Sequence, residues 1–101
     1  MRIIYSTQAF NDLQEIDEYI SSVLRNPKSA EMVIEKILKS ISNLDINPKL
    51  GMSLSEKINR DTNIRYLISG KYIVFYRIGD SIEIIRILDA RRDYMREIFT
   101  G

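Results

Sequence analysis

The sequence predicts an α+β fold, in which an N-terminal strand and a two-helix hairpin pack on a curved antiparallel β-sheet and a short C-terminal helix follows. Three observations lead to this prediction. Apolar residues recur at helical spacing in the first half of the chain, short β-branched and aromatic runs alternate with turns in the second half, and the helical segments precede most of the strands. The 101 residues fit one domain, residues 1–101.

The chain opens with a short strand and a long amphipathic helix. Residues 1–6 combine β-branched and aromatic residues, and Ser6 or Thr7 can cap the helix that follows. We predict this helix over residues 9–24, with a buried stripe formed by Ala9, Leu13, Ile16, Ile20, Val23 and Leu24. Four carboxylates lie off the stripe, and we interpret them as a solvated face and not as a metal site: Asp12, Glu15, Asp17 and Glu18.

A second helix is expected over residues 28–44, because Asn26 can cap it and Pro27 suits its first turn. Its buried stripe is Ala30, Val33, Ile34, Ile37, Leu38, Ile41 and Leu44. Residues 45–61 contain Pro48, Gly51 and several Ser and Asn residues, which predicts an ordered loop. We expect five apolar residues to anchor that loop: Ile46, Leu50, Met52, Leu54 and Ile58.

Three strands follow, over residues 64–69, 72–78 and 82–88, separated by two short turns that each contain glycine. A three-residue second turn pairs Arg77 with Glu83, Phe75 with Ile85 and Tyr76 with Ile84. Both faces of these strands are apolar, so one face lies under the hairpin and the other is covered by another segment or available to a partner. Residues 90–99 predict a short arginine-rich helix.

Composition excludes several classes of function. The chain has no cysteine and no histidine, which removes disulfides, thiolate chemistry, the commonest general base and the usual zinc ligands. We expect no metal and no cofactor. The net charge of +1 provides no overall basic field for nucleic acid. No apolar run is long enough to span a membrane, and no signal peptide is recognisable, so we expect a cytoplasmic protein without membrane partners.

Arginine is concentrated late in the chain. Residues 60–101 hold eight basic and six acidic side chains, and seven of the eight cations are arginine, which suits carboxylate and phosphate recognition. The candidate target-binding residues are Arg65, Arg86, Arg91, Arg92 and Tyr94. Each also has a structural interpretation: a strand-edge cation for Arg65, an ion pair with Asp89 or Glu83 for Arg86, a solvated helix start for the Arg91–Arg92 pair, and packing for Tyr94.

Nearly the whole chain resembles the RelE/ParE toxin superfamily. Residues 9–20, which read A-F-N-D-L-Q-E-I-D-E-Y-I, are similar to the family's opening A-x-x-D-L-x-x-I-x-x-Y-I. Arg65, the strand K-Y-I-V-F-Y-R-I at residues 71–78, the strand I-E-I-I-R-I-L at 82–88 and A-R-R-D-Y at 90–94 are similar to the family's run of strands that ends in a basic segment. No single piece is diagnostic, whereas the ordered set is.

The resemblance implies a compact toxin that a cognate antitoxin, encoded beside it, neutralises in a toxin–antitoxin hetero-oligomer. ParE-like members are described as acting on DNA gyrase, and RelE-like members cut messenger RNA in the ribosome. Tyr72, Val74 and Tyr76 alternate on one strand, and we expect them to be core residues or to face the antitoxin.

The ParE-like interpretation is favoured because the residues for RNA cleavage are incomplete. Attack of a 2′-hydroxyl on the phosphate needs a base, an acid and cations for the developing charge. Ile73 stands where the RNA-cutting branch usually carries arginine, and histidine is absent. In a nuclease the catalytic candidates would be Arg65, Arg92 and Tyr94. Two alternatives stay open: a ribosome-dependent endoribonuclease, and a degenerate member that has lost toxicity.

Overall fold

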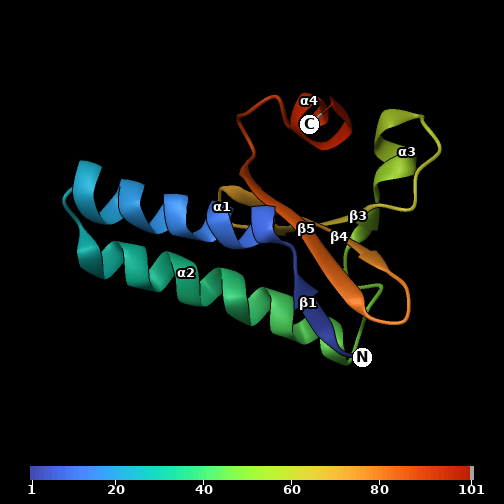
Figure 1. Cartoon of the computed structure of the whole chain (residues 1–101), viewed down its shortest axis with the longest axis horizontal. Helices are drawn as coiled ribbons and strands as arrows, with labels where there is room; N and C mark the ends of the chain where they lie inside the picture. Colours follow the sequence, from blue (N-terminus) through green and yellow to red (C-terminus); the bar gives the residue numbers. More distant parts are fainter. Residues whose placement is uncertain (101) are drawn as a thin grey trace.

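The computed structural model, which describes residues 1–100, contains one mixed five-stranded sheet with helices on both of its faces (Figure 1). The strand order is β1-β5-β4-β3-β2. The strands are β1 (Ile3–Tyr5), β2 (Met52–Ser53), β3 (Arg65–Ser69), β4 (Tyr72–Ile78) and β5 (Ile82–Asp89). Only β1 runs parallel to its neighbour, β5, and the other pairs are antiparallel. The predicted α+β fold is confirmed, with a small parallel contribution at one edge.

The helical hairpin consists of α1 (Thr7–Glu18), the π-helical turn η1 (Tyr19–Val23) and α2 (Pro27–Ser42). Ser6 caps α1 by accepting a hydrogen bond from the backbone of Ala9, and Asn26 caps α2. The prediction that Val23 and Leu24 are buried is wrong, because 66% and 55% of their surface is exposed. A π-helical turn adds a residue to the helix and rotates the following side chains off the stripe.

Residues 45–61 are more structured than a loop and are anchored only partly as we expected. After the 3₁₀ turn η2 (Asn43–Asp45), they contain β2 and the short helix α3 (Leu54–Ile58). Leu54 is buried, but Ile46, Leu50 and Met52 are exposed. Leu54 and Ile58 anchor the segment in an apolar core against the sheet, as expected, and hydrogen bonds to its backbone hold its first part. The Tyr76 hydroxyl accepts a hydrogen bond from Gly51 N (2.9 Å) and donates one to Pro48 O (2.8 Å).

The register of the β4–β5 hairpin is confirmed at two positions and corrected at one. Arg77 pairs with Glu83 and Tyr76 pairs with Ile84, as expected. A β-bulge shifts the register beyond Tyr76, so Phe75 lies opposite Arg86 and not opposite Ile85. The extra residue in β5 changes the direction of the strand and moves Arg86 into position beside α1.

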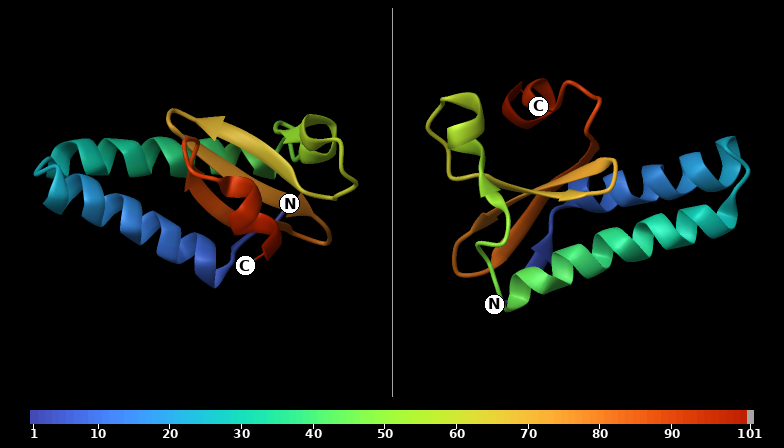
Figure 2. Two further views of the ribbon diagram at one scale, coloured as in Figure 1. Left: turned by 90° about the horizontal axis from the view of Figure 1, so that it is seen from above. Right: turned by 180° about the vertical axis from the view of Figure 1, so that it is seen from behind.

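The α1–α2 hairpin lies on one side of the sheet, and α3 and the C-terminal helix lie on the other (Figure 2). An apolar core fills each side. The hairpin covers one face, where Ile37 and Ile41 of α2 pack against Val74, Tyr76 and Ile84. The other face is covered by α3 and by the C-terminal helix α4 (Tyr94–Thr100), around Phe75. The expected C-terminal helix therefore begins at Tyr94, and residues 90–93 form a turn before it. Both faces of the sheet are covered within the chain itself.

Candidate functional site

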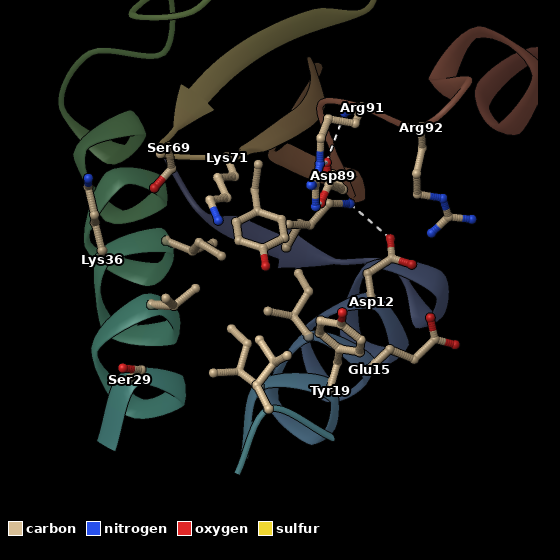
Figure 3. Close-up of a pocket in the computed structure, with 18 of the residues that line it drawn as sticks. Asp12, Glu15, Tyr19, Ser29, Lys36, Ser69, Lys71, Asp89, Arg91 and Arg92 are labelled. Carbon is tan, nitrogen blue, oxygen red and sulfur yellow. Dashed lines mark hydrogen bonds and ion pairs between the residues drawn. The ribbon is translucent and has the colours of Figure 1, made fainter. Parts of the chain in front are cut away.

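A groove of about 1150 Å³ opens between the helical hairpin and the sheet (Figure 3). We call it the hairpin groove. Ile16, Ile20 and Ile37 contribute apolar walls, and Tyr19 and Tyr72 add aromatic rings with polar tips. Polar and charged side chains stand around these walls, from α1, α2, the β3–β4 turn and the segment after β5: Asp12, Glu15, Asn26, Ser29, Lys36, Ser69, Lys71, Asp89, Arg91 and Arg92. Such a combination suits an amphipathic segment of a partner.

Arg91 lies at the rim of the groove, paired with Asp89. Its Nη2 is 2.8 Å from Asp89 Oδ2, and its Nε and backbone N both donate to Oδ1. These hydrogen bonds lower the pKa of Asp89 to about 2. Burial, and then the charge of Asp89, raise the pKa of the neighbouring Tyr72. The Arg91 side chain remains 79% exposed, so it is accessible to a partner even though it is paired.

Arg86 is a structural residue in this conformation, and its partners differ from those we expected. Its Nε and Nη2 donate to the two carboxylate oxygens of Asp12 at 2.8 and 3.0 Å, and Nη1 lies 3.4 Å from Glu97. Neither Asp89 nor Glu83 is its partner; they bind Arg91 and Arg77. The hydrogen bonds that Arg86 donates to Asp12 are the main cause that raises the pKa of Arg86.

Asp12 corrects the interpretation of the acidic residues of α1 as one solvated face. Its side chain is 5% exposed, and Oδ2 also accepts a hydrogen bond from the backbone N of Ile87 (2.8 Å). Glu15, Asp17 and Glu18 are exposed, as expected. No group of three or more side chains that could hold a metal ion occurs in residues 1–100.

Arg92 and Tyr94 begin the C-terminal segment. Arg92 pairs with Glu97 of α4, and its side chain is about half exposed. The Tyr94 ring packs against Phe75, with 5.4 Å between ring centroids, and the ammonium of Lys57 lies 5.7 Å from the Tyr94 ring. Tyr94 therefore belongs to the core on the α3–α4 side of the sheet.

Arg65 lies on the face of the sheet that the helical hairpin covers, opposite to the face that carries Tyr94. It lies opposite Tyr76 in the β3–β4 register, and residues opposite one another share a face of the sheet. Its guanidinium donates to the backbone carbonyls of Lys49 and Gly51. Because Tyr76 packs under the hairpin and Phe75 on the opposite side, the sheet separates Arg65 from Tyr94. Three residues that a nuclease would have to combine are not brought together.

Of the three residues expected in the core or facing an antitoxin, only Tyr72 reaches a surface. It is half-buried and lines the hairpin groove. Val74 and Tyr76 have no exposed surface and belong to the core beneath the hairpin. They share a face with Tyr72, as the alternation predicted, but the helices cover them.

Sequence reasoning missed several residues of the groove. Tyr19 was absent from our predicted stripe, yet it lines the groove from the π-helical turn. Lys36 and Ser69 come from α2 and from the end of β3, and only the packing of these elements brings them to one cavity.

No helix in residues 1–100 is long and apolar enough to cross a membrane.

Comparison with known proteins agrees with this architecture. The model of the ParE toxin family, from the type II toxin–antitoxin system parDE, matches residues 3–94. A solved structure described as the chromosomal ParDE TA system from P. aeruginosa has a TM-score of 0.74 and 22% sequence identity, over 88% of this chain and 95% of that chain. At that identity the likeness concerns the fold. No curated protein sequence matches the chain.

Proposed function

We propose that this chain, which belongs to the ParE toxin family and is the toxin component of a type II toxin–antitoxin system, arrests growth by binding DNA gyrase. A cognate antitoxin neutralises it by forming a toxin–antitoxin complex. The proposed target confines its action to the cytoplasm. In this proposal the chain is a binding poison and needs no chemistry, cofactor or metal of its own.

The separation of Arg65 from Tyr94 by the sheet is the observation that favours binding over RNA cleavage. General acid–base catalysis requires the groups to converge within hydrogen-bond reach of one phosphate. Arg65 is tied to the loop before β2, and Tyr94 is packed on Phe75. Ile73, which occupies the position of the arginine in the RNA-cutting branch, is 4% exposed and part of the α3–α4 core.

The proposed contact surface for gyrase is the turn that carries Arg91 and Arg92. Both guanidinium groups lie at the surface, and both are oriented by carboxylates from the same end of the chain, Asp89 and Glu97. Such preoriented arginines offer several donors to carboxylates of a protein partner. Arg65 and Arg86 are engaged in backbone and buried contacts, so we assign them supporting roles.

The antitoxin, in this proposal, occupies the hairpin groove. Tyr72 and Tyr19 offer aromatic surface there, and Arg91 and Arg92 line the same cavity. An antitoxin segment in the groove would therefore cover the two arginines that we assign to the target. Neutralisation then requires no change in the fold of the toxin.

Inducing the chain in growing bacteria, while following growth, DNA breaks with filamentation, and messenger RNA cleavage, tests the target. We expect arrest with DNA damage and intact transcripts. Arrest with transcripts cut inside translated regions would contradict the gyrase assignment, and absence of arrest would indicate the degenerate member. The Tyr94→Phe variant is expected to arrest growth as the wild type does, whereas a nuclease that used this hydroxyl as an acid would lose activity.

The double variant Arg91→Ala/Arg92→Ala tests the contact surface. We expect it to abolish growth arrest, because it removes both preoriented guanidinium groups from the surface. The matched control is Arg2→Ala/Arg77→Ala, which removes two exposed arginines outside the hairpin groove. Growth arrest by the first variant at the wild-type level, with the control also active, would rule out this surface.

A further inference from the structure

We propose that the β3–β4 end of the hairpin groove is an anion subsite, formed by the Ser69 hydroxyl and the ammonium groups of Lys36 and Lys71. Its ligand is a carboxylate side chain of the protein segment that docks in the groove. This inference rests on the proposed function, because the docking segment is there the antitoxin. It adds a chemical requirement to that partner: an acidic residue at one end of an otherwise apolar stretch.

The three groups converge on one tight turn (Figure 3). Ser69 and Tyr72 face each other across β3 and β4, so only Gly70 and Lys71 connect them. Gly70 has φ +59, as the first position of a II′ turn requires. Lys36 comes from α2, and its Nζ lies 3.8 Å from the point where a Cβ on Gly70 would stand. Two ammonium groups and one hydroxyl therefore surround the same turn.

Ser69 is the group that points to a ligand. The residue is 4% exposed, and its Oγ has no hydrogen-bond partner among residues 1–100 although it is buried. Buried hydroxyls nearly always have a partner, so an unpaired one at the wall of a groove indicates an acceptor that is missing from the isolated chain. A carboxylate oxygen in the groove would supply that acceptor.

The other two cations that line the groove, Arg91 and Arg92, are each paired with a carboxylate. Arg91 binds Asp89, Arg92 binds Glu97, and Asp12 binds Arg86. Lys71 also contributes to the lowered pKa of Asp89, but the oxygens of that carboxylate bond to Arg91. Within the described part of the chain, neither Lys36 nor Lys71 has an ion-pair partner.

The rest of the groove favours a protein as the source of the anion. Glu15 and Tyr19 stand on the α1 side, away from Lys36 and Ser69 (Figure 3). The walls between them are apolar, with Ile16, Ile20 and Ile37. A nucleic-acid backbone would need a succession of cations along the groove, and it would leave these walls without apolar contacts. An amphipathic peptide segment can place apolar side chains against these walls and an acidic side chain at the cationic end of the groove.

The test measures the affinity of purified toxin variants for the product of the adjacent reading frame, by calorimetry at two salt concentrations. We expect Ser69→Ala to weaken binding about tenfold or more, as the loss of a hydrogen bond to a charged group predicts. Lys36→Gln/Lys71→Gln should weaken it similarly and reduce its salt dependence. The matched control, Lys28→Gln/Lys39→Gln, removes two exposed cations of α2 outside the groove and should change affinity less than twofold.

Misfolding cannot explain a loss of affinity in Ser69→Ala, because that substitution removes an unpaired buried hydroxyl and should leave the melting temperature unchanged or raise it. Two further variants, Tyr19→Arg and Leu24→Arg, test whether the antitoxin binds in the groove at all, because both residues are exposed and line it. If these variants also bind normally, the antitoxin does not use the groove. If they bind weakly while the Ser69 and lysine variants bind normally, only the anion subsite is wrong. Loss of binding to a short oligonucleotide in the lysine variant, with antitoxin binding intact, would likewise overturn it.

Discussion

At the scale of single residues, Asp12 holds together parts of the chain that are far apart in sequence. Its carboxylate accepts two hydrogen bonds from Arg86 and one from the backbone N of Ile87. Among residues 1–100, β5 has no strand partner beyond Ile84 on that side, because β1 pairs with residues 82–84. Ser6 bonds to Ile85 O and Asp12 bonds to Ile87 N, so two side chains satisfy the edge that β1 leaves open.

We predict that Asp12→Ala lowers the free energy of unfolding by about 3 kcal/mol or more. The substitution leaves the nearly buried Arg86 side chain with only its 3.4 Å contact to Glu97, and it leaves the backbone N–H of Ile87 without its acceptor. Urea denaturation with an unchanged m-value would measure it. Glu15→Ala, on the exposed side of the same helix, is the control and should change the unfolding free energy by less than about 0.5 kcal/mol. Equal effects from the two substitutions would contradict the structural role of Asp12.

At the scale of elements, polar anchors hold the segment between α2 and β3 against the sheet, in addition to the apolar contacts of Leu54 and Ile58. The Tyr76 hydroxyl binds backbone groups of Pro48 and Gly51, and Arg65 binds the carbonyl of Gly51. Gly51 has no room for a side chain, because a Cβ would approach the Tyr76 hydroxyl to 2.7 Å. The loop thus closes over one end of the hairpin core, next to β2.

Tyr76→Phe should therefore destabilise the protein by about 1–3 kcal/mol, because the buried N–H of Gly51 loses its acceptor while the ring stays in place. The measurement is thermal or urea unfolding, together with faster amide exchange at Gly51. Tyr72→Phe is the matched control, since no hydrogen bond of the Tyr72 hydroxyl occurs among residues 1–100. A Tyr76→Phe protein as stable as the control would show that the loop does not depend on this hydroxyl.

At the scale of the whole molecule, the net charge is small, and several arginines late in the chain are held in ion pairs with carboxylates. The net charge is +1, and Arg77, Arg86, Arg91 and Arg92 each have a carboxylate partner. Nucleic-acid affinity depends on the number of phosphates neutralised by free cations. This arrangement agrees with a toxin that works through contact with proteins.

We accordingly predict no measurable binding of the isolated chain to naked duplex DNA or single-stranded RNA at 150 mM salt. Fluorescence anisotropy with labelled oligonucleotides would test it, and a Kd tighter than about 1 µM would contradict the prediction, because non-specific binding driven by charge is weaker than that. The positive control is the antitoxin complex, whose formation shows that the same preparation is folded and active in binding.

The sequence by itself determined the long helices, most of the strands and their order along the chain. Periodicity identified both helices and all three C-terminal strands, and the caps Ser6 and Asn26 stand where the helix signals predicted them. The Arg77–Glu83 pair followed from a three-residue turn, which we preferred because it brings opposite charges and apolar residues together. These features depend on residues within a few positions of one another, where spacing is sufficient to predict geometry.

Tertiary structure decided everything that depends on contacts between distant segments. Asp12 is buried because Arg86 and Ile87, more than 70 positions away, come to it. Val23 and Leu24 are exposed because of the π-helical turn, and the groove residues Lys36, Ser69 and Tyr19 meet only after α1, α2 and β3 have packed. A local pattern reports which residues prefer burial, but the neighbour that satisfies a buried charge is set by the path of the whole chain.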